Sequence, residues 1–101
     1  MNIKPNNPRI TCADGVSLSV QASEFHYCSP RLNEIDHWAD YSAVEVGYIE
    51  DTDGNAFTPP DEWSEYADGA FPASVYGYVP TEMVKAFIEE HGGAESTITN
   101  N

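Results

Sequence analysis

The chain has 101 residues, of which 41% are hydrophobic and 12% aromatic. This composition indicates one folded domain over residues 1–101 rather than a disordered acidic tail, and no apolar run approaches the ~20 residues of a membrane span. Seventeen Asp and Glu residues oppose four Lys and Arg, and the resulting net charge of −13 disfavours nucleic acids and anionic membranes as ligands.

The first residues, MNIKPNNPR, contain no apolar segment of the kind found in secretory signals. We therefore expect a soluble, cytoplasmic protein. In such a reducing compartment Cys12 and Cys28 are expected to be free thiols, although the sequence leaves a bridge between them open. The polar ends, residues 1–7 and 94–101, are expected to be flexible.

A β-hairpin is predicted near the N-terminus. Residues 9–13 suit a first strand, and Asp14-Gly15 is typical of a two-residue hairpin turn. Residues 16–22 alternate strictly between apolar and polar side chains, which indicates a half-buried strand. Its core-facing side chains should be Val16, Leu18, Val20 and Ala22.

A longer strand is predicted over residues 41–50, with Val44, Val46 and Tyr48 on one face. Residues 51–55 are rich in Asp, Gly and Asn and predict a turn.

The second half of the chain predicts a short helix, a strand and a longer helix. Residues 59–66 suit the short helix, because a proline stands near its start and carboxylates fill its first turn. Residues 75–79 predict a strand on which Tyr76 and Tyr78 share one face.

The clearest helix is predicted over residues 82–91, with Thr81 as its N-cap and two glycines after it. Its apolar stripe consists of Met83, Val84, Phe87 and Ile88. These elements predict an α+β fold: an antiparallel sheet of about four strands packed against a C-terminal helix, with one short extra helix.

The segment EFHYCSPR, residues 24–31, brings together side chains that are common in active sites. His26 and Cys28, with Cys12 and His37, would supply four zinc ligands, but the tight ligand pairs of structural zinc sites are missing. A Cys28 nucleophile is disfavoured because the acidic field raises a thiol pKa. We expect no catalytic residue, metal or cofactor, with a metal site at these four residues as the alternative.

A second candidate metal site is the segment that starts at Asp51. Asp51, Asp53, Asn55 and Glu62 match oxygen ligand positions of a calcium loop. Ala56 replaces the glycine that the loop requires at its sixth position, and a hairpin turn explains the same residues.

Residues 32–84 contain no Lys or Arg and twelve carboxylates. Without nearby counter-ions these groups repel one another, and they favour a basic protein partner, which their field would attract. The alternative is an acidic surface that serves solubility alone.

Four stretches, ITCADGVSLSVQAS, HYCSPR, YSAVEVGYIED and VYGYVPTEMVKAFIEEHGG, resemble small proteins encoded by bacteriophages and prophages. Some proteins of this kind are anti-CRISPR inhibitors, and the resemblance covers most of residues 8–93. It implies binding to a CRISPR effector complex in the bacterial host, where acidic inhibitors occupy a basic DNA-binding surface and mimic DNA. Anti-CRISPR proteins share no single fold, and no catalytic residues carry over.

This resemblance and the charge together predict a non-enzymatic inhibitor that blocks recognition of the target DNA and its PAM. The expected partner-binding carboxylates are Glu45, Glu50, Asp51, Asp53, Asp61, Glu62, Glu65 and Asp68. Trp63 and Tyr66 are expected to be aromatic anchors. The alternatives are an inhibitor of another DNA-processing or restriction enzyme, and a phage accessory protein with no inhibitory role.

Overall fold

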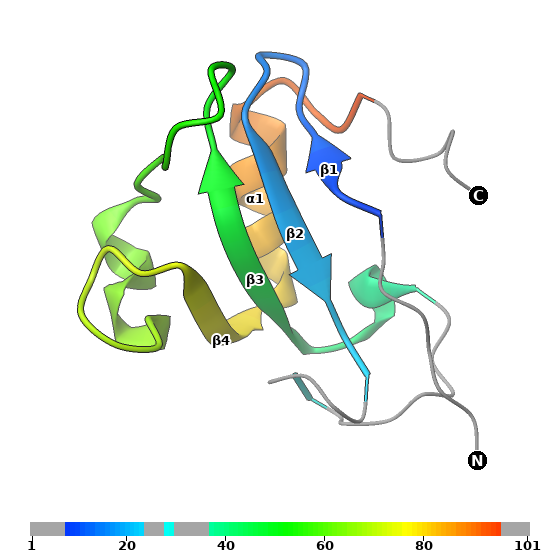
Figure 1. The fold of residues 1–101 in the computed structure, drawn as a ribbon. Helices are drawn as coiled ribbons and strands as arrows, with labels where there is room; N and C mark the ends of the chain where they lie inside the picture. Colours follow the sequence, from blue (N-terminus) through cyan, green and yellow to red (C-terminus); the bar gives the residue numbers. More distant parts are fainter. Residues whose placement is uncertain (1–7, 24–27, 30–36, 96–101) are drawn as a thin grey trace.

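The computed structural model describes residues 8–23, 28–29 and 37–95 (Figure 1). In these residues a four-stranded antiparallel sheet packs against a C-terminal helix, so the predicted α+β fold is confirmed. The strands, in the order β1-β2-β3-β4, are β1 (Ile10–Thr11), β2 (Ser17–Gln21), β3 (Ala43–Glu50) and β4 (Val75–Pro80). Two 3₁₀ helices, η1 (Trp38–Asp40) and η2 (Asp61–Tyr66), precede the α-helix, α1 (Thr81–Glu90).

The hairpin of β1 and β2 is confirmed, and it places Val16, Leu18, Val20 and Ala22 in the core. Its turn is stabilised by Asp14, whose Oδ1 accepts a hydrogen bond from the Val16 amide at 3.0 Å. Gly15 has φ +96°, and a Cβ at this position would lie 2.0 Å from Thr52 Cγ2. Glycine therefore allows this turn and the turn after β3 to lie side by side (Figure 1).

A β-bulge interrupts β3 at Tyr48. The register against β2 shifts by one residue here, and Tyr48 has φ +52°, an uncommon backbone conformation for a bulky side chain. The shift turns Tyr48 outward with 59% of its surface exposed and places Ile49 in the core. The prediction that Tyr48 shares a face with Val44 and Val46 is therefore wrong.

A second bulge lies in β4, the neighbouring strand. Its register against β3 shifts by one residue between Tyr76 and Val79, and Tyr78 has φ +56°. Tyr76 is buried in the core, whereas Tyr78 is 45% exposed. The prediction that these two tyrosines share a face is wrong for the same reason: an inserted residue reverses the alternation.

Arg9, the residue before β1, contacts β2 and β3 on the face of the sheet opposite α1. Its guanidinium donates to the carbonyl of Tyr48 at the β3 bulge and, at 3.1 Å, to the hydroxyl of Ser17. It also forms an ion pair with Glu50 at 3.4 Å. One of the few cations of the chain therefore stabilises the fold.

Helix α1 lies across the other face of the sheet, behind β2 and β3 in Figure 1. Val84, Phe87 and Ile88 of its predicted stripe are buried, and Met83 is partly buried. Among the described residues, no helix has both the length and the apolar character needed to cross a lipid bilayer.

The start of α1 differs from the prediction. Thr81 is the first helical residue rather than the N-cap, and Pro80 stands in the cap position. The Thr81 hydroxyl instead donates to the Tyr41 carbonyl at 2.6 Å and is buried. The side chain thus joins the helix to the segment before β3.

The chain after α1 returns to the edge of the sheet. Ala94 pairs with Cys12, and the Glu95 amide donates to the Thr11 carbonyl at 2.7 Å. These two residues therefore lie against the β1 edge of the sheet. The remaining residues of the two ends that are expected to be flexible, 1–7 and 96–101, lie outside the described residues.

Trp63 attaches η2 to the core. Only 1% of its surface is exposed, and its ring makes edge-to-face contacts with Tyr76 at 5.7 Å and Phe87 at 5.4 Å between ring centroids. One side chain of the short helix therefore contacts both the sheet and α1.

We predict that Trp63→Ala lowers the free energy of unfolding by about 3–5 kcal/mol, because it removes a large buried aromatic side chain and leaves a cavity. Ser64→Ala, at the exposed neighbouring position, should change it by less than about 0.5 kcal/mol. Urea denaturation of both variants measures these values. A loss of less than about 1 kcal/mol for Trp63→Ala would contradict the packing described here.

The hairpin turn and the end of α1 are joined by Asp14 and His91, whose Oδ2 and Nδ1 atoms lie 2.5 Å apart. The pKa of Asp14 is lowered, first by the hydrogen bond from the Val16 amide and then by that from His91. A lowered pKa means that ionised Asp14 stabilises the fold above the ordinary pKa of an aspartate, about 3.9. This stabilisation is lost as the pH falls through the lower pKa of the folded state.

We predict that Asp14→Asn lowers the free energy of unfolding at pH 7. Its difference from the wild type should shrink as the pH falls below about 4, because Asp14 then takes up a proton, first in the unfolded chain and, at its lower pKa, in the folded one. Asn retains a side-chain oxygen that can accept the hydrogen bond from the Val16 amide, so the substitution removes only the negative charge of Asp14. Denaturant unfolding at several pH values provides the measurement. Equal stabilities at pH 7 would refute the role assigned to this pair.

Candidate functional site

Helix η2 and the two residues after it, Ala67 and Asp68, form a segment with exposed carboxylates at the edge of the sheet, beside β4 (Figure 1). Trp63 points into the core and Tyr66, three residues later, packs against it, so the other four side chains of this short helix are exposed. Glu62 and Glu65 are three residues apart, so in a 3₁₀ helix they lie on the same side. Asp61, Glu62, Glu65 and Asp68, which we call the η2 carboxylates, are all exposed, and none forms an ion pair with a described residue.

The turn after β3 uses one of its carboxylates internally. Asp51 Oδ1 accepts hydrogen bonds from the amides of Asp53 at 2.9 Å and Asn55 at 3.0 Å. Asp51 is therefore a turn-stabilising residue, and Asp53 is the exposed charge of this segment. Within the described ranges, no three His, Cys, Asp or Glu side chains are close enough together to hold a metal ion.

Glu45 and Glu50 lie on β3, on the face of the sheet opposite α1, and both are partly buried. Glu50 is the ion-pair partner of Arg9. Its charge is therefore partly balanced within the fold, which the spacing of charges along the sequence does not indicate.

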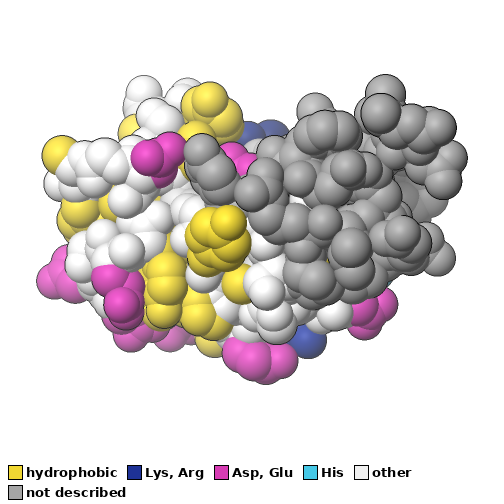
Figure 2. All heavy atoms as spheres, turned by 90° about the horizontal axis from the view of Figure 1, so that it is seen from below, with side chains coloured by type: hydrophobic (Ala, Val, Ile, Leu, Met, Phe, Trp, Pro, Cys, Tyr) yellow, Lys and Arg dark blue, Asp and Glu magenta, His cyan; other side chains and the backbone are white. Residues whose placement is uncertain are grey.

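The predicted carboxylates consequently fall into two groups rather than one continuous patch. One group is on η2 beside β4, and the other is on β3 and its turn (Figure 1). In the view from below, Asp and Glu side chains lie along the left and lower borders of the described surface, with hydrophobic and polar atoms between them (Figure 2).

The two predicted aromatic anchors differ in exposure. Trp63 is a core residue, so its assignment as a surface anchor is wrong. Tyr66 is partly exposed at the end of η2. Burial raises the pKa of Tyr66, and the charge of Glu65 and a hydrogen bond to it raise the pKa further. Tyr66 therefore stays neutral at physiological pH.

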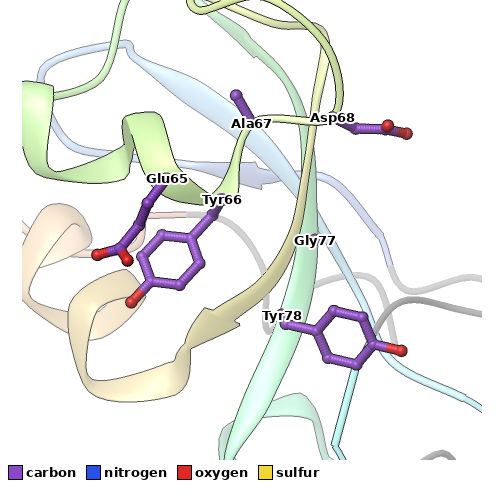
Figure 3. A pocket seen from close by; sticks show the side chains of 6 residues that line it. All are labelled: Glu65, Tyr66, Ala67, Asp68, Gly77 and Tyr78. Atoms are coloured by element: carbon purple, nitrogen blue, oxygen red, sulfur yellow. The ribbon is translucent and has the colours of Figure 1, made fainter.

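A shallow, open pocket of about 290 Å³ lies where the chain after η2 runs along β4. Its lining residues are Glu65, Tyr66, Ala67, Asp68, Gly77 and Tyr78 (Figure 3). Glu65 and Tyr66 lie together on one side of it, and Asp68 and Tyr78 project on the other (Figure 3). Gly77 and Tyr78 were not predicted as site residues, because the bulge that turns Tyr78 outward leaves no signal in the sequence.

The cysteines lie in the core. Cys12 and Cys28 are free thiols, as expected, and each is at most 1% exposed. The Cys28 thiol donates to the Ser23 carbonyl at 3.0 Å. Burial, and secondarily the charge of Asp14, raise the pKa of Cys12.

Of the two histidines in the zinc hypothesis, one has a structural role in the described chain. His37 Nδ1 accepts a hydrogen bond from the Ala39 amide at 3.0 Å and caps η1. His26 lies outside the described residues.

No known protein family, curated protein or solved structure matches this chain. Its function is therefore inferred from the chemistry of its own surface.

We predict that neither thiol reacts with a thiol-specific reagent such as Ellman's reagent at pH 8 in the folded protein, because both sulfur atoms are buried. Both should react at once in denaturant. Cys28→Ser and Cys12→Ser variants assign any signal to one residue. Rapid labelling of Cys28 in the folded protein would contradict this prediction and would support a reactive thiol in the segment EFHYCSPR.

Proposed function

We propose that this protein is a phage-encoded inhibitor that binds the basic DNA-binding surface of a CRISPR effector complex and blocks recognition of target DNA and its PAM. The observation that supports this proposal best is the arrangement of the η2 carboxylates. They are exposed on a segment that a buried tryptophan holds in place, and no described residue neutralises them.

The chemistry of the expected partner matches this surface. Duplex DNA carries about one negative charge per 1.7 Å of its axis. CRISPR effectors hold nucleic acid in positively charged channels and contact the PAM through basic side chains. Carboxylates spaced along one edge of a small protein can occupy such a surface in place of phosphates.

Rigid display of these charges favours binding. Side chains on a flexible tail lose conformational entropy when they bind, whereas side chains on a fixed element lose less. Trp63 fixes η2 against Tyr76 and Phe87, so the backbone of the η2 carboxylates is already ordered before the partner arrives.

The β3 group should contribute less. Asp51 accepts two backbone hydrogen bonds and Glu50 pairs with Arg9, so part of their interaction capacity is used within the fold. Asp53 is exposed and can add to the long-range attraction of a basic partner.

The proposed mechanism is stoichiometric binding. It requires no catalytic residue, metal or cofactor and no direct contact with nucleic acid, and it would operate in the cytoplasm of the bacterial host. The protein would dissociate or exclude DNA by occupying the same basic side chains.

A second candidate is an inhibitor of another basic DNA-processing or restriction enzyme. The same exposed charges favour it, because such enzymes also present cationic channels to DNA. A panel that contains both CRISPR effector complexes and restriction or repair nucleases separates the two candidates by affinity.

We predict that the triple variant Asp61→Asn/Glu62→Gln/Glu65→Gln weakens binding to the cognate effector complex on the order of tenfold, since each exposed charge pair contributes little alone. The matched control is Glu82→Gln/Glu89→Gln/Glu90→Gln on α1, where three exposed carboxylates are neutralised. Both variants change the net charge by three, so the comparison isolates position from total charge. Biolayer interferometry at fixed salt measures both affinities.

Equal weakening by both variants would mean that net charge alone matters and would contradict an interface at η2. Unchanged binding by both would contradict the electrostatic mechanism itself. Thermal unfolding of each variant checks that its fold is retained.

A further inference from the structure

Three aspartates of this chain are followed directly by glycine, at residues 14–15, 53–54 and 68–69. Such an Asp-Gly step is prone to spontaneous cyclisation, in which the glycine nitrogen attacks the aspartate carboxyl group, because glycine has no Cβ to obstruct the approach. The reaction needs a carboxyl group and an amide that are not held by other hydrogen bonds, and room for the two to reach a reactive geometry. The three steps differ in each of these conditions.

The step at Asp14 is held by its neighbours. One carboxylate oxygen accepts a hydrogen bond from the Val16 amide at 3.0 Å, and the other lies 2.5 Å from Nδ1 of His91. The Gly15 amide donates to a backbone carbonyl of the same turn at 2.9 Å, and the turn after β3 packs directly against this glycine. Both reacting groups are therefore already engaged, and the space around them is filled.

The step at Asp53 is held at its amide. Gly54 donates its N–H to the Asp51 carbonyl at 3.0 Å, and the amides of Asp53 and Asn55 both donate to the Asp51 side chain. The nitrogen that would attack is fixed within the turn. These hydrogen bonds must break before it can reach the Asp53 carboxyl group.

The step at Asp68 has neither constraint. The Asp68 carboxylate makes no hydrogen bond or ion pair with a described residue, and Figure 3 shows it projecting away from Glu65 and Tyr66. The Gly69 amide donates no hydrogen bond to the described part of the chain. Gly69 has φ +109°, and a Cβ at this position would meet no atom within 4 Å. Both reacting groups are therefore free, and open space surrounds them.

The chain leaves the sheet between these two residues. The Asp68 amide is bonded to the Val75 carbonyl at 2.9 Å, whereas Gly69 begins a loop over residues 69–74 whose backbone is largely exposed. One side of the reacting pair is held by the sheet, and the other belongs to a loop. Rotation of the connecting peptide therefore disrupts no sheet pairing.

We propose that Asp68 is a site of spontaneous isoaspartate formation, and that it reacts severalfold faster than the other two Asp-Gly steps in the folded protein. The Gly69 nitrogen bonds to Cγ of Asp68, and one water molecule leaves, made from the carboxyl hydroxyl and the amide proton. A second water molecule then adds to one of the two carbonyl groups of the ring. When it adds to the main-chain carbonyl, the bond from this carbon to the Gly69 nitrogen breaks, and the chain continues through Cγ.

The product keeps its negative charge but changes its position. The former main-chain carbonyl becomes the carboxylate, and the former Cβ lengthens the main chain by one carbon at the start of the loop. The modification thus moves one of the η2 carboxylates without neutralising it. This inference goes beyond the proposed function and does not depend on it.

The test is incubation of the full chain at pH 7 in water enriched in oxygen-18, once folded and once in urea. Each opening of the ring introduces one heavy oxygen atom. Cleavage after glutamate then separates the three Asp-Gly steps into peptides 1–24, 51–62 and 66–82, in which mass spectrometry measures the label and the isoaspartate. We expect peptide 66–82 of the folded protein to gain both severalfold faster than the other two peptides, and all three to react at similar rates in urea.

Two matched variants assign the reaction to one residue. Asp68→Glu keeps the charge at an exposed position, but its longer side chain must close a six-membered ring and cyclises far more slowly. It should remove most of the label from the folded, intact protein. Asp53→Glu makes the same change at the other exposed Asp-Gly step and should leave the label nearly unchanged.

Three results would overturn the proposal. The first is labelling of peptide 1–24 or 51–62 as fast as 66–82 in the folded protein. The second is an absence of label from 66–82 when the same peptide reacts in urea. The third is the same order of rates in urea as in the folded protein, because the local sequence rather than the fold would then select the site.

Discussion

The packing of Trp63 against Tyr76 and Phe87 is the constraint on which the rest of the molecule depends. It joins η2, the sheet and α1 through one buried ring, and its position decides which way the remaining side chains of η2 point. The carboxylates that would bind a partner are exposed because the tryptophan between them is buried. Trp63, which was expected to contact the partner, instead attaches η2 to the core of the protein itself. The same buried side chain therefore stabilises the fold and holds the η2 carboxylates at the surface.

The structure differs from the sequence-based prediction mainly at two β-bulges, one in β3 and one in β4. The hairpin, the apolar stripe of α1 and the α+β architecture follow from hydrophobic periodicity, which depends on residue type alone. The outward turn of Tyr48 and Tyr78 does not, because a single inserted residue reverses the faces of a strand without any change in composition. The pocket that contains Tyr78 was therefore missed, although Glu65, Tyr66 and Asp68 on its other walls were predicted from charge and aromatic content.

Counting charges along the chain overstates the free charge of β3 and its turn. Arg9, far away in sequence, reaches Glu50 on β3 across strand β2, and Asp51 stabilises its own turn. These partners are set by register and turn geometry, which composition cannot indicate. The η2 carboxylates lack such partners among the described residues, and this difference concentrates the proposed interface at the edge of the sheet beside β4.

If the acidic edge binds where DNA would otherwise bind, this protein and DNA must compete for the same basic surface. The most direct measurement is a competition experiment, in which this protein and a PAM-containing duplex compete for one purified CRISPR effector complex at increasing salt. We expect mutually exclusive binding and an affinity that falls steeply as the Debye length shrinks from about 10 Å at 0.1 M to about 3 Å at 1 M salt. A stable ternary complex with DNA, or an affinity that salt does not change, would contradict it.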